Sequence, residues 1–216
     1  MTQSKTYFAE VAQDWDGIRS GFFTEAMRDA AIARAALPEN ALVADVGTGT
    51  GFVLRGLLAQ AGELTGFDHS PEMLAVARSN FAGLLNVRFQ LAEGQHLPAE
   101  DNYFDAVFAN MYLHHAPDPQ AAISEMARIL KPGGKLLITD LDTHLEAWMR
   151  EAMADRWLGF QREDVRRWYA AAGLHKIDVD CAQGSCDCTG PQQEDISLSI
   201  FVAIGEKNEK MSTFGK

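Results

Sequence analysis

The amino-acid sequence predicts an α/β fold, a doubly wound parallel sheet covered by helices on both faces. Through the middle of the chain, short apolar runs of strand length alternate with segments of helical periodicity, which is the pattern of consecutive βαβ units. A glycine-rich stretch follows the first apolar run directly, and open parallel sheets bind ligands where such turns leave the strands. The two observations together predict a ligand site at the carboxyl ends of the strands.

The composition is that of one folded domain. The 216 residues are 47% hydrophobic and 23% charged, which excludes dominant disorder and low-complexity structure. We expect a single domain over residues 1–206, in which residues 1–38 form an N-terminal helical segment, followed by a polar tail over residues 207–216.

The charge balance limits the partners. Nineteen basic residues against thirty acidic ones give a net charge of −11, and a field of that sign repels phosphate backbones and anionic lipids. The adjacent basic pair Arg166-Arg167 lies beside Glu163 and Asp164. We therefore expect a small-molecule substrate, with neither nucleic acid nor membrane insertion.

The sequence also indicates a compartment. No apolar run approaches the roughly 20 residues that span a bilayer, and residues 1–14 lack the apolar centre of a signal peptide. Three cysteines, all late in the chain, give no disulfide framework. We expect a cytoplasmic protein.

The first elements follow from periodicity. Residues 7–36 are expected to form two helices, the second rich in alanine. Residues 41–46 are a continuous apolar run of strand length. Residues 51–61 place apolar side chains at helical spacing, and residues 64–68 form the next strand.

The central elements carry clear boundary signals. Ser70-Pro71 can cap and begin a helix. Strands are expected at 86–91 and 105–109. A helix over 118–130 has Pro119 in its first turn and ends at a Lys-Pro-Gly-Gly stop.

The last third continues the alternation. A strand is expected at 135–140 and a helix at 163–172, which Gly173 ends. Two final strands are expected at 177–181 and 196–204. The glycine, cysteine and polar residues between them, 184–194, predict a loop.

The glycine stretch is the most informative motif. Gly47, Gly49 and Gly51 alternate between a strand and a helix, so the backbone can turn sharply and approach a ligand without a Cβ in the way. The helix that follows directs free N–H groups toward the same place.

The spacing excludes two common cofactor classes. A third glycine in the dinucleotide pattern would stand at Phe52 or Leu54, and no Gly-Lys-Ser/Thr follows for a P-loop. Asp45, just before the loop, would repel a pyrophosphate and suit a cation. Asp68 ends the second strand and can accept both hydroxyls of a ribose. A ribose beside a cation, without pyrophosphate, describes S-adenosylmethionine.

Five segments in order resemble the Rossmann-like S-adenosylmethionine-dependent methyltransferases, and most closely their ubiquinone/menaquinone-type or arsenite-type small-molecule branch. The similar segments are VADVGTGTG (43–51), GFDHS with Met73 (66–70), AEGQHLP (92–98), FDAVFAN with LHH (104–115) and ILKPGG (129–134). The adenine-binding position, usually Asp in the family, is Glu93 here.

This resemblance implies a fold and a set of ligand contacts. The family's sheet has seven mostly parallel strands in the order 3-2-1-4-5-7-6, with the seventh antiparallel. Its cofactor is S-adenosylmethionine. The positions that the resemblance assigns to the cofactor are Asp45, Gly47 and Gly49 for the methionine end, Asp68 for the ribose, His69 and Met73 for the adenine faces, Glu93 and Gly94 for its edge, and Asn110 for the sulfonium side.

The catalytic residues are less constrained, because the sulfonium already activates the methyl group and most of the rate can come from positioning. His114 and His115 are the candidate catalytic residues, either as a base or as a substrate contact; packing at the start of a loop is the alternative. Asp140, Asp142 and His144 either line the substrate side or form solvated caps of the next helix.

Several aromatic residues have two possible roles as well. In the N-terminal segment they either close over the cofactor as a lid or pack on the sheet edge. After the fifth strand, they either wall the substrate cavity or belong to the core. The first group is Tyr7, Phe8, Trp15, Phe22 and Phe23, and the second is Trp148, Trp157 and Phe160.

Three interpretations of function stay open. Methyl transfer to a small molecule is the first. Cys181, Cys186 and Cys188 could instead hold a metalloid or metal acceptor, although no fourth ligand for a structural zinc is evident and no metal site is expected. The third interpretation is a regulator that binds the cofactor without turnover.

Overall fold

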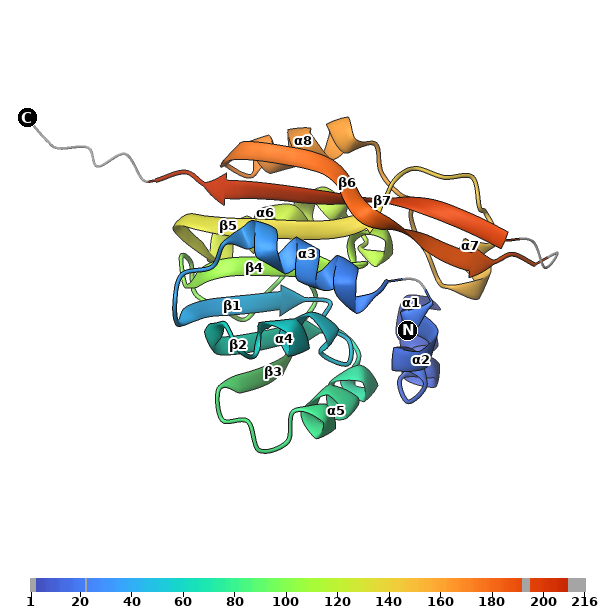
Figure 1. Ribbon diagram of the computed structural model, residues 1–216, viewed down its shortest axis with the longest axis horizontal. Coiled ribbons are helices and arrows are strands. Elements are labelled where there is room, and N and C mark those ends of the chain that lie inside the picture. The colour runs from blue at the N-terminus through green and yellow to red at the C-terminus, as the bar shows by residue number, and fades with distance from the viewer. Residues whose placement is uncertain (1–2, 22, 192–194, 210–216) are drawn as a thin grey trace, which may run out of the picture.

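The computed structural model describes residues 3–21, 23–191 and 195–209, and the side chains of 183–189 are not described. One seven-stranded sheet runs through the molecule in the order β3-β2-β1-β4-β5-β7-β6, and helices pack on both of its faces (Figure 1). The predicted fold class and strand order are therefore confirmed. The strands are β1 (Ala41–Val46), β2 (Ala61–Asp68), β3 (Val87–Leu91), β4 (Phe104–Asn110), β5 (Leu130–Leu141), β6 (Leu174–Thr189) and β7 (Asp195–Lys207).

The helices occupy the connections and the amino-terminal end. They are α1 (Gln3–Val11), α2 (Trp15–Ser20), α3 (Glu25–Ala35), α4 (Phe52–Leu57), α5 (Pro71–Asn80), the short 3-10 turn η1 (Leu113–His115), α6 (Pro119–Ile129), α7 (Met149–Ala152) and α8 (Arg162–Ala171). Ser70 caps α5 as the sequence predicts, accepting from Met73 N, and Asp118 caps α6 by accepting from Ala121 N.

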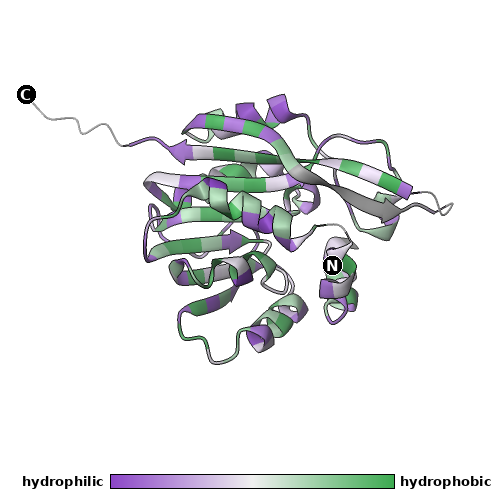
Figure 2. Cartoon of the chain, viewed as in Figure 1, coloured by the Kyte–Doolittle hydropathy of each residue, from purple (hydrophilic) through white to green (hydrophobic). Residues whose placement is uncertain are grey.

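The central strands are continuous apolar runs in the sequence because both faces of the sheet are buried. The strands from β3 to β5 pair in parallel and β7 pairs antiparallel with both neighbours. Successive side chains of a strand point to opposite faces: Val43 packs in one apolar layer and Ala44 in the other. Figure 2 shows the apolar central strands. A sheet buried on both faces carries its ligand site at its strand ends.

The structure corrects four element predictions. Residues 3–21 and 23–35 form three helices instead of two, because the chain also turns between Val11 and Trp15, where Asp14 N donates to Val11 O, before Thr24 caps α3. The helix expected over 51–61 stops at Leu57, and β2 already begins at Ala61. The loop expected over 184–194 is wrong for 184–189, which extend β6 along β7; residues 192–194 lie outside the described residues. The strand β7 also runs to Lys207, three residues beyond its expected end at 204 and onto the first residue of the expected tail.

Candidate functional site

The glycine loop wraps the end of β2. Gly47 N and Thr48 N both donate to Phe67 O, at 2.8 and 3.0 Å. Gly47, Gly49 and Gly51 have φ of 73°, 52° and 92°, the left-handed region that favours glycine. A Cβ at Gly47 would lie 2.5 Å from the ring of Tyr112. The loop therefore needs glycine for its conformation and for its packing.

Asp68 lies at the centre of the cleft above this loop. Its Oδ2 accepts from Gly49 N at 2.8 Å and its Oδ1 from Ser70 N at 2.9 Å. Burial raises the pKa of Asp68 even though His69 and these N–H groups oppose the shift. Each oxygen keeps a lone pair for a further donor, as two adjacent hydroxyls of a sugar would supply.

Asp45 is the strongest electrostatic feature of the cleft. Its side chain is buried, and neither carboxylate oxygen has a hydrogen-bond partner among the described residues. Burial raises its pKa to about 7; the nearby Thr48 hydroxyl opposes this rise, and the charge of Asp68 adds to it. A buried carboxylate without a partner favours a cationic ligand.

The other predicted cofactor residues line the same cleft. His69, Met73 and Asn110 lie in the part that contains Asp45. Glu93 and Gly94 lie in the adjoining part, where Glu93 is half-exposed and forms an ion pair with Lys5 of α1. The structure thus brings together all nine residues that the resemblance assigned to the cofactor.

Tyr112 divides the two parts of the cleft, and sequence reasoning missed it. Its ring packs on Gly47, and a Cβ at Gly94 would meet its hydroxyl. Burial raises the pKa of Tyr112 well above its usual value, and the charges of Asp68 and Glu93 add to this. The hydroxyl is therefore neutral at physiological pH.

The N-terminal helices cover the cleft. The Asp16 carboxylate accepts from Thr50 Oγ1 at 2.7 Å, which connects α2 to the glycine loop. The Arg19 guanidinium lies 3.6 Å from the ring centroid of Phe52, and Phe8 packs edge-on against His115 with centroids 4.9 Å apart. Phe22, named among the lid aromatics, lies outside the described residues.

A second, mostly apolar pocket adjoins the cleft. It shares Trp15, Arg19, Met111 and His115 with the cleft, so His115 is part of the wall between them. The remaining lining residues are Phe23, His114, Leu141, Met149, Met153 and Asp155. A ligand here would lie next to the methionine end of a cofactor in the cleft.

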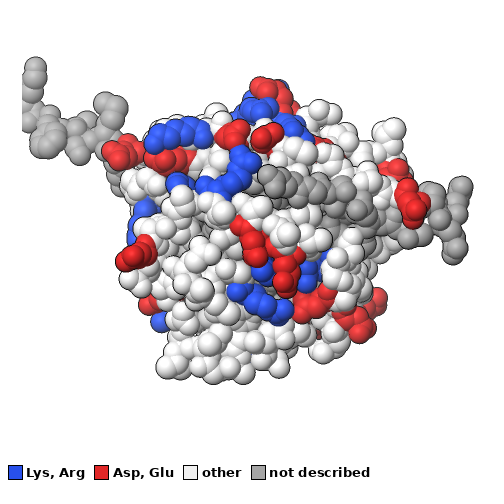
Figure 3. All heavy atoms as spheres, viewed as in Figure 1, with Lys and Arg blue, Asp and Glu red and all other residues white. Residues whose placement is uncertain are grey.

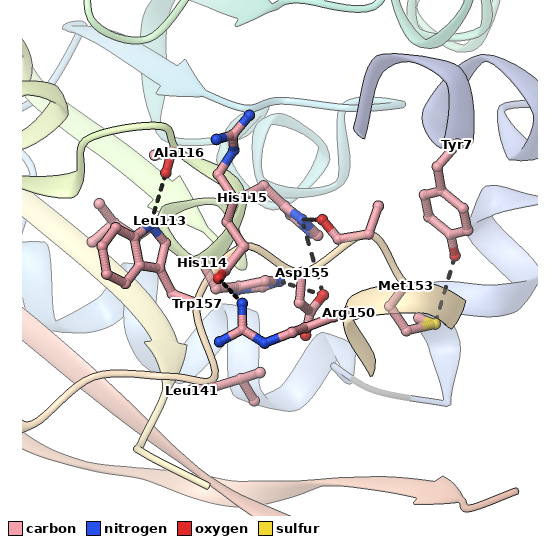
Figure 4. A network of polar contacts seen from close by, with 12 residues as sticks. Tyr7, Leu113, His114, His115, Ala116, Leu141, Arg150, Met153, Asp155 and Trp157 are labelled. Carbon is pink, nitrogen blue, oxygen red and sulfur yellow. Dashed lines mark hydrogen bonds and ion pairs between the residues drawn. The ribbon is translucent and has the colours of Figure 1, made fainter. Parts of the chain in front are cut away.

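The polar floor of this pocket is shown in Figure 4. The His114 Nδ1 lies 2.7 Å from Asp140 Oδ1. Burial alone would lower the pKa of His114, but Asp140 outweighs it and raises the pKa to about 9. Burial and the charge of His114 lower the pKa of His115 well below its usual value, and burial raises that of Asp155 to about 6. Sequence reasoning missed Asp155, because no local motif marks it.

Burial and pairing distinguish the roles predicted for Asp140 and Asp142. Asp140 is fully buried beneath the pocket and is no solvated cap, whereas Asp142 forms an ion pair with Arg162 at 2.6 Å. None of the three aromatic residues at 148, 157 and 160 lines the apolar pocket.

Cys181 is a free, exposed thiol, and the side chains of Cys186 and Cys188 lie outside the described residues.

Comparison with known proteins agrees with this geometry. Residues 44–138 match the family model described as a methyltransferase domain. The spinach (Spinacia oleracea) 2-methyl-6-phytyl-1,4-hydroquinone methyltransferase is 33% identical over 166 residues, which are 75% of this chain and 48% of that protein. The chain contains a methyltransferase domain and has the fold of the Rossmann-like S-adenosylmethionine-dependent methyltransferases. It spans about half the length of the first curated relatives that it matches.

Another relative is named for a role in quinone biosynthesis. The Xylella fastidiosa ubiquinone biosynthesis O-methyltransferase is 33% identical over 156 residues, which are 64% of this chain and 63% of that protein. Among solved structures, the methyltransferase bound to the Haloferax volcanii Trm112 methyltransferase activator has a TM-score of 0.81 and 23% identity, covering 96% of this chain and 98% of that one. This structural likeness supports the fold.

Replacing Gly47 with Ala tests the loop. We expect the free energy of unfolding to fall by about 2–4 kcal/mol, because the added methyl is strained at this φ and meets the ring of Tyr112. We also expect S-adenosylhomocysteine to bind at least tenfold more weakly. Urea unfolding and calorimetry measure the two effects.

The matched control is Gly83→Ala. Gly83 also has a positive φ, of 88°, but a Cβ added there would have no atom within 4 Å. We expect a loss of only about 1 kcal/mol in this variant. Equal losses in the two variants would show that the contact between Gly47 and Tyr112 is unimportant.

Proposed function

We propose that the chain transfers the methyl group of S-adenosylmethionine to a small-molecule acceptor. The observation that carries this is the unpaired, buried Asp45 carboxylate in the same cleft as Asp68. A cationic amino-acid group suits the first carboxylate and a ribose suits the second. A dinucleotide would instead bring its diphosphate toward Asp45.

The chain's own residues fit this cofactor without rearranging the sheet. The glycine loop and Asp45 would hold its methionine end, Asp68 its ribose, His69 and Met73 the faces of its adenine, and Glu93 and Gly94 the adenine edge. When bound, the cofactor supplies an activated methyl group on a sulfonium. The chain's task is then to position the acceptor and to exclude water.

The acceptor would occupy the apolar pocket. Its methionine, leucine and aromatic lining suits a mostly apolar molecule, and His114, His115 and Asp155 present polar groups at one end. We propose an aromatic acceptor of the hydroquinone class, in keeping with the relatives named above. In this arrangement His114 and His115 are the candidate catalytic residues, which contact the acceptor's hydroxyl.

Charge supports a small acceptor over a nucleic acid. The net charge is −11, and acidic and basic side chains are interspersed on the face in Figure 3, without a basic patch. Among the described residues, no helix has the length and apolarity that would let it cross a membrane. The N-terminal segment 1–38 would act as a lid, since α2 contacts the glycine loop.

Methyl transfer is measured as S-adenosylhomocysteine formed from S-adenosylmethionine, with 1,4-naphthohydroquinone, methylhydroquinone and catechol as test acceptors. We expect formation that depends on the acceptor and falls at least 100-fold in Asp68→Asn. The control is Asp101→Asn, whose carboxylate is exposed and pairs with Arg128. Tight cofactor binding without any acceptor-dependent turnover would instead favour the regulator.

The metalloid alternative has its own test. Replacing Cys181, Cys186 and Cys188 together with Ser should leave turnover of the hydroquinones unchanged. Turnover of arsenite that disappears in this triple variant would favour the thiol-bound acceptor.

A further inference from the structure

Two imidazoles and a carboxylate meet at the floor of the apolar pocket. His114 Nε2 and His115 Nδ1 lie 3.8 and 4.0 Å from the same atom, Asp155 Oδ1, and the three donor atoms lie within 4.8 Å of one another (Figure 4). Both distances are too long for hydrogen bonds. Tetrahedral ligands about 2.0–2.1 Å from a zinc ion lie about 3.3 Å apart, so small side-chain rotations bring these atoms to ligand spacing.

The buried carboxylate of Asp155 lacks part of its hydrogen bonding. Its side chain is 1% exposed, and its Oδ2 has no hydrogen-bond partner among the described residues. A carboxylate oxygen this deeply buried ordinarily has a donor or a cation beside it. The preceding Ala154 has a φ of 59°, and its carbonyl oxygen lies 3.3 Å from His115 Nδ1. Because a carbonyl oxygen only accepts, His115 Nδ1 is the donor of this hydrogen bond, and a bound ion would replace that proton.

Asp140 orients the first imidazole from behind. Its Oδ1 faces His114 Nδ1 at 2.7 Å, and its Oδ2 accepts from Leu113 N at 2.8 Å. Leu141 N donates to Oδ1 at 2.7 Å. The carboxylate is thereby fixed, and it holds the Nδ1 side of the ring while Nε2, whose proton a bound ion would displace, faces Asp155. A histidine that binds a metal through one ring nitrogen usually donates a hydrogen bond from the other nitrogen to a carboxylate, a backbone carbonyl or water.

We propose that His114, His115 and Asp155 bind one divalent transition-metal ion, with zinc the best match to two imidazoles and a carboxylate. Magnesium and calcium prefer all-oxygen sites. Three protein ligands leave a fourth position open toward the apolar pocket, as in catalytic zinc sites. There the ion would meet the acceptor's oxygen. That role rests on the proposed function, whereas the binding of the ion does not.

Cobalt(II) is the direct probe, because its visible absorption reports the number and type of ligands. The chelator-treated full-length chain is titrated with Co²⁺ and then with Zn²⁺. The three late cysteines are replaced with Ser in every sample, since thiolates also bind these ions. We expect one equivalent of Co²⁺ to bind with the spectrum of a four- or five-coordinate nitrogen–oxygen site, and Zn²⁺ to displace it.

Two variants localise the site. Asp155→Asn and His115→Gln should each weaken Co²⁺ binding at least tenfold, while His175→Ala should leave it unchanged, because His175 lies on β6 beside Glu206. Thermal unfolding establishes that each variant is folded. Absence of binding in the parent, or equal binding in the parent and both folded site variants, would overturn the proposal. Calorimetry with S-adenosylhomocysteine in the same samples tests the cofactor cleft separately.

Discussion

Replacing Asp68 with Asn should weaken S-adenosylhomocysteine binding at least 100-fold. The carboxylate already accepts from Gly49 N and Ser70 N, and two ribose hydroxyls would add two charge-assisted hydrogen bonds of about 1.5–3 kcal/mol each. An amide has one acceptor oxygen and would direct its NH₂ toward a backbone N–H. Calorimetry measures the dissociation constant.

The control for this experiment is again Asp101→Asn, which makes the same chemical change on the surface. Thermal unfolding of Asp68→Asn separates a binding defect from loss of fold. A folded Asp68→Asn protein with the parent's affinity would show that the ribose does not bind at this carboxylate.

Replacing Asp45 with Asn should remove the pH dependence of cofactor binding. In the parent, the pKa of Asp45 is raised to about 7 by burial, and the ligand's ammonium would favour the ionised form. The parent's affinity for S-adenosylhomocysteine should therefore rise as pH increases from 6 to 8. At pH 8 we expect Asp45→Asn to bind S-adenosylhomocysteine at least tenfold more weakly than the parent does. The affinity of this variant should change little between pH 6 and pH 8.

The same substitution should stabilise the free protein at alkaline pH. The folded-state pKa of Asp45 lies above its unfolded value of 3.8, so the folded state binds the proton more tightly. The free energy of unfolding of the parent then falls as pH rises from about 4 to about 7, by up to about 4 kcal/mol from this group. Asp45→Asn should lose this decline.

Urea unfolding of both proteins between pH 4 and pH 8 measures the difference. We expect the variant to be the more stable protein at pH 8 and the gap to close toward pH 4. A parent that is more stable than Asp45→Asn at pH 8 would mean that the carboxylate has a stabilising partner in the free protein. Asp68 also has a raised pKa, and its charge adds to the rise at Asp45, so the loss of this mutual repulsion is part of the expected difference between the two proteins.

The cofactor cleft could be predicted because its signals are local in the sequence. Asp45 lies near the end of one strand, Gly47 and Gly49 follow that strand, and Asp68 ends the next, so the βαβ connection alone brings them together. The loop needs glycine at positive φ, and this requirement is visible in the sequence as glycine itself. The strand order came from the family resemblance.

The apolar pocket could not be predicted to the same degree, because distant segments form it. Asp155 reaches His114 only through the turn after α7, and Tyr112 reaches Gly94 only across the sheet end. Neither residue stands in a motif. Composition also gave a wrong prediction at 184–189, where glycine, cysteine and polar residues form a strand because β7 provides a pairing partner.

A crystal structure of the chain with S-adenosylhomocysteine tests the central claim most directly. We expect the ribose hydroxyls on Asp68, the ammonium group beside Asp45 and the sulfur facing the pocket that His115 borders. A ligand bound elsewhere, with no ligand in the glycine-loop cleft, would contradict this arrangement.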